Sequence, residues 1–123
     1  RYPYRDLLAA RAVDVLQPDL SICGGISEAR HIASLASAYQ VQLAPHVFGG
    51  AVIFAAGLHF AMAVPNVTIL EHCHGHNPLL HELAPERFPL MDGHFEVADR
   101  PGLGVTPDPA RVAEFTRDWR REL

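Results

Sequence analysis

The sequence contains no lysine, and all ten of its basic residues are arginine. In many enzymes a lysine amine forms a Schiff base or accepts the reacting proton. Any mechanism that needs such an amine cannot be completed by this chain. The net charge of −4 also gives no basic surface for nucleic acid or an anionic membrane, so we expect neither as a partner.

Cysteine and long apolar runs are scarce as well. Cys23 and Cys73 are too few and too far apart for a disulfide framework, and they predict free thiols in a reducing, cytoplasmic compartment. Residues 1–8 lack the apolar core of a signal peptide. The longest apolar run, residues 51–64, is shorter than the ~20 residues that span a bilayer. It predicts a buried helix.

What the sequence does contain is an alternation of helix and strand. Apolar residues at helical spacing predict three helices, over residues 4–12, 27–39 and 51–64. Ser27 is the expected N-cap of the second helix. Short, nearly continuous apolar runs predict three strands, over residues 13–19, 41–46 and 67–71. This alternation indicates an α/β fold with a parallel sheet of about three βα units.

Residues 77–123 have a different composition and are predicted to form a C-terminal tail. Prolines make residues 77–90 loop-like, and Asp92-Gly93 is a hairpin signal. Asp108-Pro109 marks the start of a last helix, whose apolar stripe would consist of Val112, Phe115 and Trp119. We therefore divide the chain into residues 1–76 and this tail.

Each predicted strand ends on an ionisable residue, namely Asp19, His46 and Glu71. The spacings of 27 residues (19 to 46) and 25 residues (46 to 71) suit one βα unit each. The three side chains would then lie at the carboxyl end of a parallel sheet, where α/β enzymes carry out catalysis. A carboxylate beside an imidazole fixes its tautomer and favours the protonated ring, so Asp19 and His46 are a candidate acid–base pair.

Structural explanations of the same residues stay open at this point. Asp19 could cap a turn, His46 could be a hydrogen-bonded core histidine, and Glu71 could face solvent. The segment 72–76, HCHGH, could be read as a metal cluster, but it lacks the separated ligand pairs of structural zinc sites. Gly24-Gly25 and Gly49-Gly50 precede helices but match no phosphate-binding motif.

Four strings, in this order and spacing, resemble the C-terminal part of the enolase superfamily: QPDLSICGGISEARHIASLA, APHVFGG, ILE and DGHFEVADRPGLGV. The closest likeness is to the mandelate racemase/muconate lactonizing enzyme-like subgroup, which includes acid-sugar dehydratases. It extends over residues 2–115.

The resemblance implies that residues 1–76 run from the fifth helix to the eighth strand of a modified TIM (β/α) barrel. Asp19 would match the sixth-strand Asp, His46 the seventh-strand catalytic His, and Glu71 the eighth-strand acid that contacts the substrate. The family uses Mg²⁺ to stabilise an enediolate. Its metal ligands lie on earlier strands, so no residue of this chain is assigned to the metal. Three residues after the Asp that corresponds to Asp19, members of the family often have a basic residue. This chain has Ile22 at that position, which leaves the substrate class open.

Two functions follow as hypotheses. In the first, the chain is part of an enzyme that removes the proton alpha to the carboxylate of a hydroxy acid or sugar acid, with dehydration favoured over racemisation. By itself the chain would be inactive, and we expect the enzyme to be a homo-oligomer. In the second, the chain is a non-catalytic remnant that self-associates through exposed sheet edges.

Overall fold

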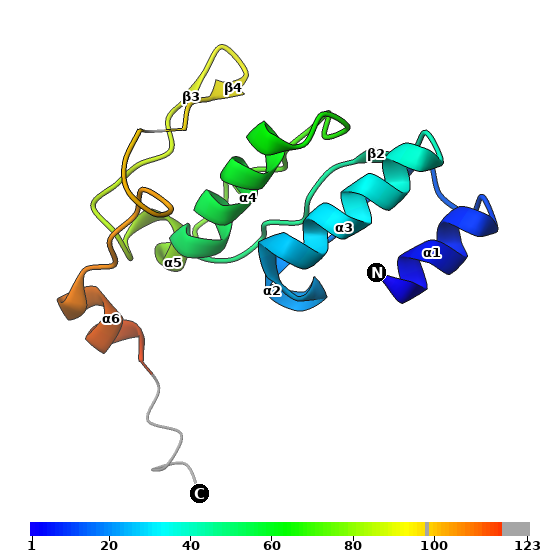
Figure 1. The fold of residues 1–123 in the computed structure, drawn as a ribbon. Coiled ribbons are helices and arrows are strands. Elements are labelled where there is room, and N and C mark those ends of the chain that lie inside the picture. The colour runs from blue at the N-terminus through cyan, green and yellow to red at the C-terminus, as the bar shows by residue number, and fades with distance from the viewer. Residues whose placement is uncertain (98, 117–123) are drawn as a thin grey trace, which may run out of the picture.

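The computed structural model describes residues 1–97 and 99–116 of the chain. Helices dominate it, and the strands are very short. In chain order the elements are α1 Tyr2–Ala9, β1 Val15–Leu16, α2 Leu20–Cys23, α3 Gly25–Ala38, β2 Gln42–Leu43, α4 Ala51–Ala63, α5 Pro78–His81, β3 Leu90–Met91, β4 His94–Phe95 and α6 Pro109–Phe115. Helices α1, α3 and α4 lie in a row, with the tail beyond α4 (Figure 1).

The two strands β1 and β2 are parallel, as the sequence predicts, with Val15 opposite Gln42 and Leu16 opposite Leu43. The pairing reaches the strand ends through an isolated parallel bridge between Asp19 and His46. A second bridge joins Leu43 to Val67, so β2 lies between β1 and the segment that follows α4. The parallel order of the sheet is therefore confirmed for β1 and β2.

The predicted third strand, residues 67–71, is wrong as a strand, and the other two are shorter than expected. Two buried prolines explain this. Leu43 both donates to Asn66 O and accepts from Thr68 N, at 2.8 and 3.2 Å, and the next donor along β2 would be Pro45. Pro18 occupies the equivalent position on β1. Because proline has no N–H, each ladder lacks its next donor, and beyond that point only the bridge at Asp19 and His46 remains.

Helix α3 begins two residues earlier than predicted. Its N-cap is Gly24, with no side-chain hydrogen bond, so the assignment of Ser27 as the cap is wrong. A short helix that the sequence did not indicate, α2, comes directly before it and is capped by Asp19. Gly24 joins the two helices at φ 113°, a left-handed conformation that glycine adopts readily. The buried face of α3 consists of Ala29, Ile32, Ala33 and Ala36.

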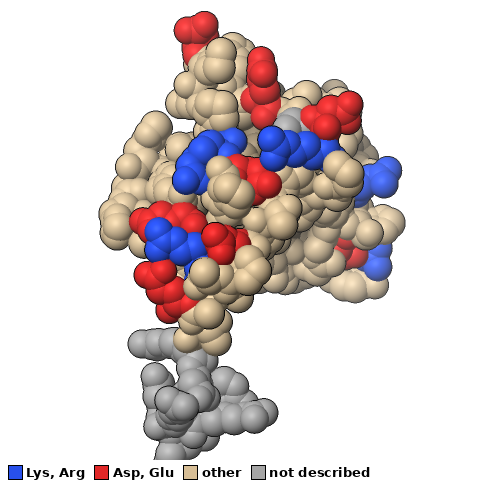
Figure 2. All heavy atoms as spheres, turned by 90° about the vertical axis from the view of Figure 1, so that its left-hand side faces the viewer, with Lys and Arg blue, Asp and Glu red and all other residues tan. Residues whose placement is uncertain are grey.

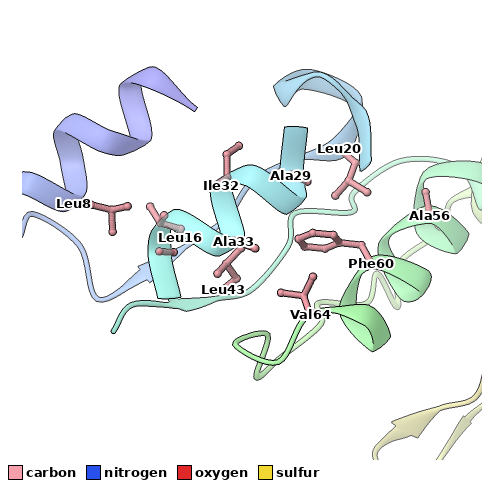
Figure 3. Packing of buried hydrophobic residues seen from close by; sticks show 11 residues of the cluster. Leu8, Leu16, Leu20, Ala29, Ile32, Ala33, Leu43, Ala56, Phe60 and Val64 are labelled. Atoms are coloured by element: carbon pink, nitrogen blue, oxygen red, sulfur yellow. The ribbon is translucent and has the colours of Figure 1, made fainter. Parts of the chain in front are cut away.

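Helix α4 forms the centre of the packing, and most of its residues are buried as predicted. Phe60 and Ala56 on one side of α4 enter the main core together with Leu16, Leu20, Ile32 and Leu43 from the sheet, α2 and α3 (Figure 3). Phe54 and Leu58 enter a second cluster with Val47 and with Leu80 of α5. Residues 1–76 and the tail thus meet on α4.

Gly57 lets α4 approach the loop that carries His46. A Cβ at this position would overlap the Cγ1 methyl of buried Val47, and valine is stiff at χ1. Alanine normally stabilises a helix by up to ~1 kcal/mol relative to glycine, whereas overpacking costs about 1–3 kcal/mol. We therefore expect Gly57→Ala to lower the free energy of unfolding in urea. A more stable variant would contradict this packing, and adding Val47→Ala should recover part of the loss.

The tail contains the predicted hairpin and last helix, together with one element that was not expected. β3 and β4 pair antiparallel around Asp92 and Gly93, which have φ values of 50° and 77°, as a tight hairpin requires. The side chain of Asp108 caps α6 by accepting from Ala110 N at 2.8 Å. Residues 77–90 were predicted as loop, but they include α5, capped by Asn77. The expected stripe on α6 is not buried at Val112, and Trp119 lies outside the described residues.

Acidic and basic side chains intermingle on the tail face of the molecule (Figure 2). Glu86 accepts from Thr106 N at 3.1 Å and pairs with Arg100 at 3.4 Å. Arg111 of α6 pairs with Glu82, next to α5, at 3.1 Å. These contacts hold the later part of the tail against residues 82–86. Within the described residues, no helix has both the length and the apolar character needed to cross a membrane.

Candidate acid–base site

The ends of β1 and β2 bring Asp19 and His46 into direct contact. His46 N donates to Pro18 O at 3.2 Å, which aligns the two chain segments beyond the strands. Asp19 Oδ2 lies 2.7 Å from His46 Nδ1. The pairing that the 27-residue spacing predicts is therefore present in the structure.

The Asp19 carboxylate is held from both sides. Its Oδ1 accepts from Ser21 N at 2.7 Å and from the Ser21 hydroxyl, while its Oδ2 faces His46. Burial by itself would raise the pKa of Asp19, but the hydrogen bonds from Ser21 and His46 outweigh it and lower that pKa below its usual value. An ionised carboxylate only accepts hydrogen bonds, so Nδ1 of His46 carries a hydrogen and Nε2 is left for a substrate.

His46 stands between this buried carboxylate and solvent. Its side chain is 42% exposed, whereas that of Asp19 is 10% exposed. The ring borders an open hollow of about 220 Å³, whose other lining residues are Val47, Phe48, Glu71, His72 and Cys73. The Asp19–His46 pair can therefore act on a molecule bound in the hollow.

Glu71 is exposed and lines the same hollow as His46. The sequence predicted that Glu71 ends a strand, and this is wrong because the ladder stops after Val67. The structure still brings Glu71 and His46 to one side of the molecule, and Asp19 joins them through the imidazole. Asp19 also caps α2, so the capping interpretation left open above is correct for this residue at the same time as the pairing with His46.

Two residues near this site were not predicted to belong to it. Ser21 is one of them, although Asp19 before it is a residue type that often caps a helix start. His72 is the other, which the sequence indicated only as part of the possible metal cluster at residues 72–76. Its Nδ1 is buried and has no hydrogen-bond partner among the described residues. The ring centre lies 5.2 Å from that of Phe54 and 5.1 Å from that of Phe95, so α4 and the hairpin enclose it.

The surroundings of His72 make stability sensitive to mild acid. Burial, followed by the nearby His74 and His81, lowers the pKa of His72 below its usual 6.5. Between those two pKa values the unfolded chain takes up a proton that the folded chain rejects. The contribution of neutral His72 to stability is therefore fully present above pH 6.5, and it is lost as the pH falls from 6.5 through the lower pKa of the folded chain.

The change that tests this is His72→Phe, which removes both the titrating ring and the buried nitrogen without a partner. We expect the variant to lose less stability between pH 7 and pH 5 than the wild type, as measured by urea unfolding at each pH. His76→Phe, at an exposed histidine in the same loop, is the matched control. Equal acid sensitivity of the wild type and His72→Phe would contradict the role of this ring.

No group of three or more His, Cys, Asp or Glu side chains within residues 1–97 and 99–116 is arranged to hold a metal ion. His72 and His74 lie close together, with ring centres 4.9 Å apart, but two imidazoles do not complete a structural zinc site. The donors present therefore do not fit a metal centre built from this part of the chain alone.

A family model described as "Enolase C-terminal domain-like" matches residues 1–111. The chain belongs to this family. Its solved relatives are mandelate racemase-like and acid-sugar dehydratase proteins, and part of each superposes on this chain.

Three similar structures illustrate the likeness. A protein from Bordetella bronchiseptica RB50, provisionally named a mandelate racemase and complexed with 2-oxoglutarate/phosphate, is 34% identical, with a TM-score of 0.90 over 95% of this chain and 31% of that one. The 3,6-anhydro-D-galactonate cycloisomerase from Zobellia galactanivorans is 32% identical, with a TM-score of 0.85 over 93% and 32%.

The third is an enolase from Agrobacterium radiobacter, provisionally named a galactarate dehydratase, with Na and L-malate bound. It is 34% identical, with a TM-score of 0.78 over 90% of this chain and 32% of that one. The chain thus spans about a third of the length of these relatives.

Proposed function

We propose that this chain supplies the acid–base half of an active site that removes the proton alpha to the carboxylate of a hydroxy acid or sugar acid. The observation that carries the proposal is the 2.7 Å contact between Asp19 and His46 beside a hollow that Glu71 also lines. In this proposal residues 1–76 are the fifth helix to the eighth strand of a modified TIM (β/α) barrel. The relatives are about three times as long, and they would serve as the guide to the rest of the barrel.

In the proposed step, Nε2 of His46 takes the alpha proton, the C–H electron pair forms a double bond to the carboxylate carbon, and the C=O π pair moves onto a carboxylate oxygen. Asp19 then stabilises the imidazolium, because its carboxylate accepts from Nδ1 and stays ionised. Glu71 would orient the substrate by accepting a hydrogen bond from a hydroxyl group. In a dehydration, the electron pairs return, the hydroxyl on the neighbouring carbon takes the proton now held by His46 and leaves as water, and the enol product rearranges to a 2-keto acid.

Mg²⁺ is the cofactor that the resemblance implies, and the residues described here do not fit it. Its ligands would have to come from outside this chain. The proton transfer proposed above uses only Asp19, His46 and Glu71. For the same reason we expect the chain alone to be inactive.

The test is proton exchange in D₂O, followed by ¹H NMR of the substrate. A protein in which this chain is joined to the remaining strands, either its own or those of the Bordetella relative, would be incubated with Mg²⁺ and with galactarate, 3,6-anhydro-D-galactonate or L-malate. We expect loss of the alpha-proton signal, or formation of a 2-keto acid, with at least one such acid. Retention of the alpha proton across a broad panel of hydroxy acids would overturn the proposal.

A second candidate is a non-catalytic module that self-associates. Exposed apolar side chains favour it, since Val15 of β1 and Ile69, two residues beyond Val67, are both exposed to solvent. Light scattering over a range of concentrations separates the two candidates. Concentration-dependent oligomers of the isolated chain, together with no exchange in the joined protein, would favour the module, whereas exchange in the joined protein would exclude it.

A further inference from the structure

The hydrogen bonds around Asp19 are divided unequally between its two carboxylate oxygens. Ser21 directs two donors, its backbone N–H at 2.7 Å and its hydroxyl, to Oδ1. Oδ2 is thereby left for His46 Nδ1 at 2.7 Å. With a donor on each side, the carboxylate cannot rotate about its Cβ–Cγ bond without breaking at least two of these bonds.

The backbone explains why Ser21 can make both contacts. Asp19 is the N-cap of α2, and the first turn of a helix directs backbone N–H groups toward the cap side chain. Ser21 is the second residue of α2, so it lies in that first turn with its hydroxyl beside the cap. An alanine at this position would keep the backbone N–H and lose only the hydroxyl.

We propose that Ser21 is a positioning residue for the acid–base pair, acting on His46 through Asp19. This inference rests on the proposed function, in which His46 is the base. The Ser21 hydroxyl keeps Oδ2 of the carboxylate directed at Nδ1, which fixes the imidazole in the tautomer with Nε2 free. A merely structural serine would strengthen the cap of α2 and leave the ring of His46 unaffected.

The test compares Ser21→Ala with Ser21→Thr, which keeps the hydroxyl, and with Ser37→Ala at an exposed position of α3. In the full chain, NMR follows the Asp19 carboxyl carbon and the two ring nitrogens of His46 during a pH titration. For Ser21→Ala we expect the Asp19 midpoint to move to higher pH and the His46 signals to show a mixture of tautomers. Ser21→Thr and Ser37→Ala should both retain the wild-type titration.

A folded Ser21→Ala variant with an unchanged Asp19 midpoint and a single His46 tautomer would overturn the inference. If Ser21→Ala does not fold, Ser21→Cys takes its place, because a thiol has similar size but is a weak donor. It should then give the same two changes. These measurements need no substrate, so they are independent of the D₂O exchange test. If the wild-type joined protein exchanges the alpha proton but Ser21→Ala leaves the Asp19 and His46 signals unchanged, only the role of Ser21 is refuted. If Ser21→Ala changes those signals but the wild-type joined protein does not exchange the alpha proton, the proposed reaction is refuted.

Discussion

His46→Asn is expected to reduce alpha-proton exchange in the joined protein by about 10²–10⁴-fold, the usual contribution of a general base. Asparagine can still donate a hydrogen bond to Asp19 Oδ2 through its side-chain amide, so the local packing should survive. It has no nitrogen that accepts a proton. The fold can therefore remain while the chemistry is lost, and NMR of the substrate in D₂O measures that loss.

The matched control is His31→Asn, at an exposed histidine on α3. It makes the same chemical change away from the hollow and should exchange at the wild-type rate. If His46→Asn also exchanged at that rate, His46 would not be the base. A circular dichroism spectrum of each variant would establish that both proteins are folded before their rates are compared.

Phe54→Ala is expected to lower the free energy of unfolding by about 3–5 kcal/mol, the range for removing a large buried aromatic side chain. Phe54 is 1% exposed. Its ring centre lies 4.9 Å from that of Phe88 and 5.3 Å from that of Phe95, both at edge-on angles that aromatic pairs favour. These contacts join α4 to the tail, so the hairpin should lose its packing first.

Urea unfolding measures this loss, and NMR signals of the β3–β4 hairpin show whether the tail detaches before the rest unfolds. Phe48→Ala provides the matched control, because Phe48 is 69% exposed. An exposed substitution of this kind should change stability by no more than about 0.5 kcal/mol. Similar losses in the two variants would mean that the tail does not depend on Phe54.

The site was predictable from the sequence to the extent that it depends on spacing. Asp19 and His46 follow apolar segments 27 residues apart, and parallel pairing of those segments places the two side chains together. Glu71 lines the same hollow as His46, although it does not end a strand. Ser21 was missed, and His72 was considered only as a possible metal ligand, because their importance depends on what surrounds them, a carboxylate in one case and aromatic rings in the other.

The sequence by itself determined the local features whose causes lie within a few residues. Asp92-Gly93 predicts its hairpin because both positions require positive φ, and Asp108-Pro109 predicts the start of α6 because a cap needs only its own first turn. The apolar run at residues 51–64 predicts a buried helix for a similar reason.

Tertiary structure decided everything that depends on a neighbour distant in the chain. Pro18 and Pro45 shorten the ladders only because a partner segment lies where their missing N–H would have donated. The pKa of His72 is lowered only when α4 and the hairpin enclose the ring. Hydrogen bonding and burial are properties of such contacts, so no local pattern could specify them.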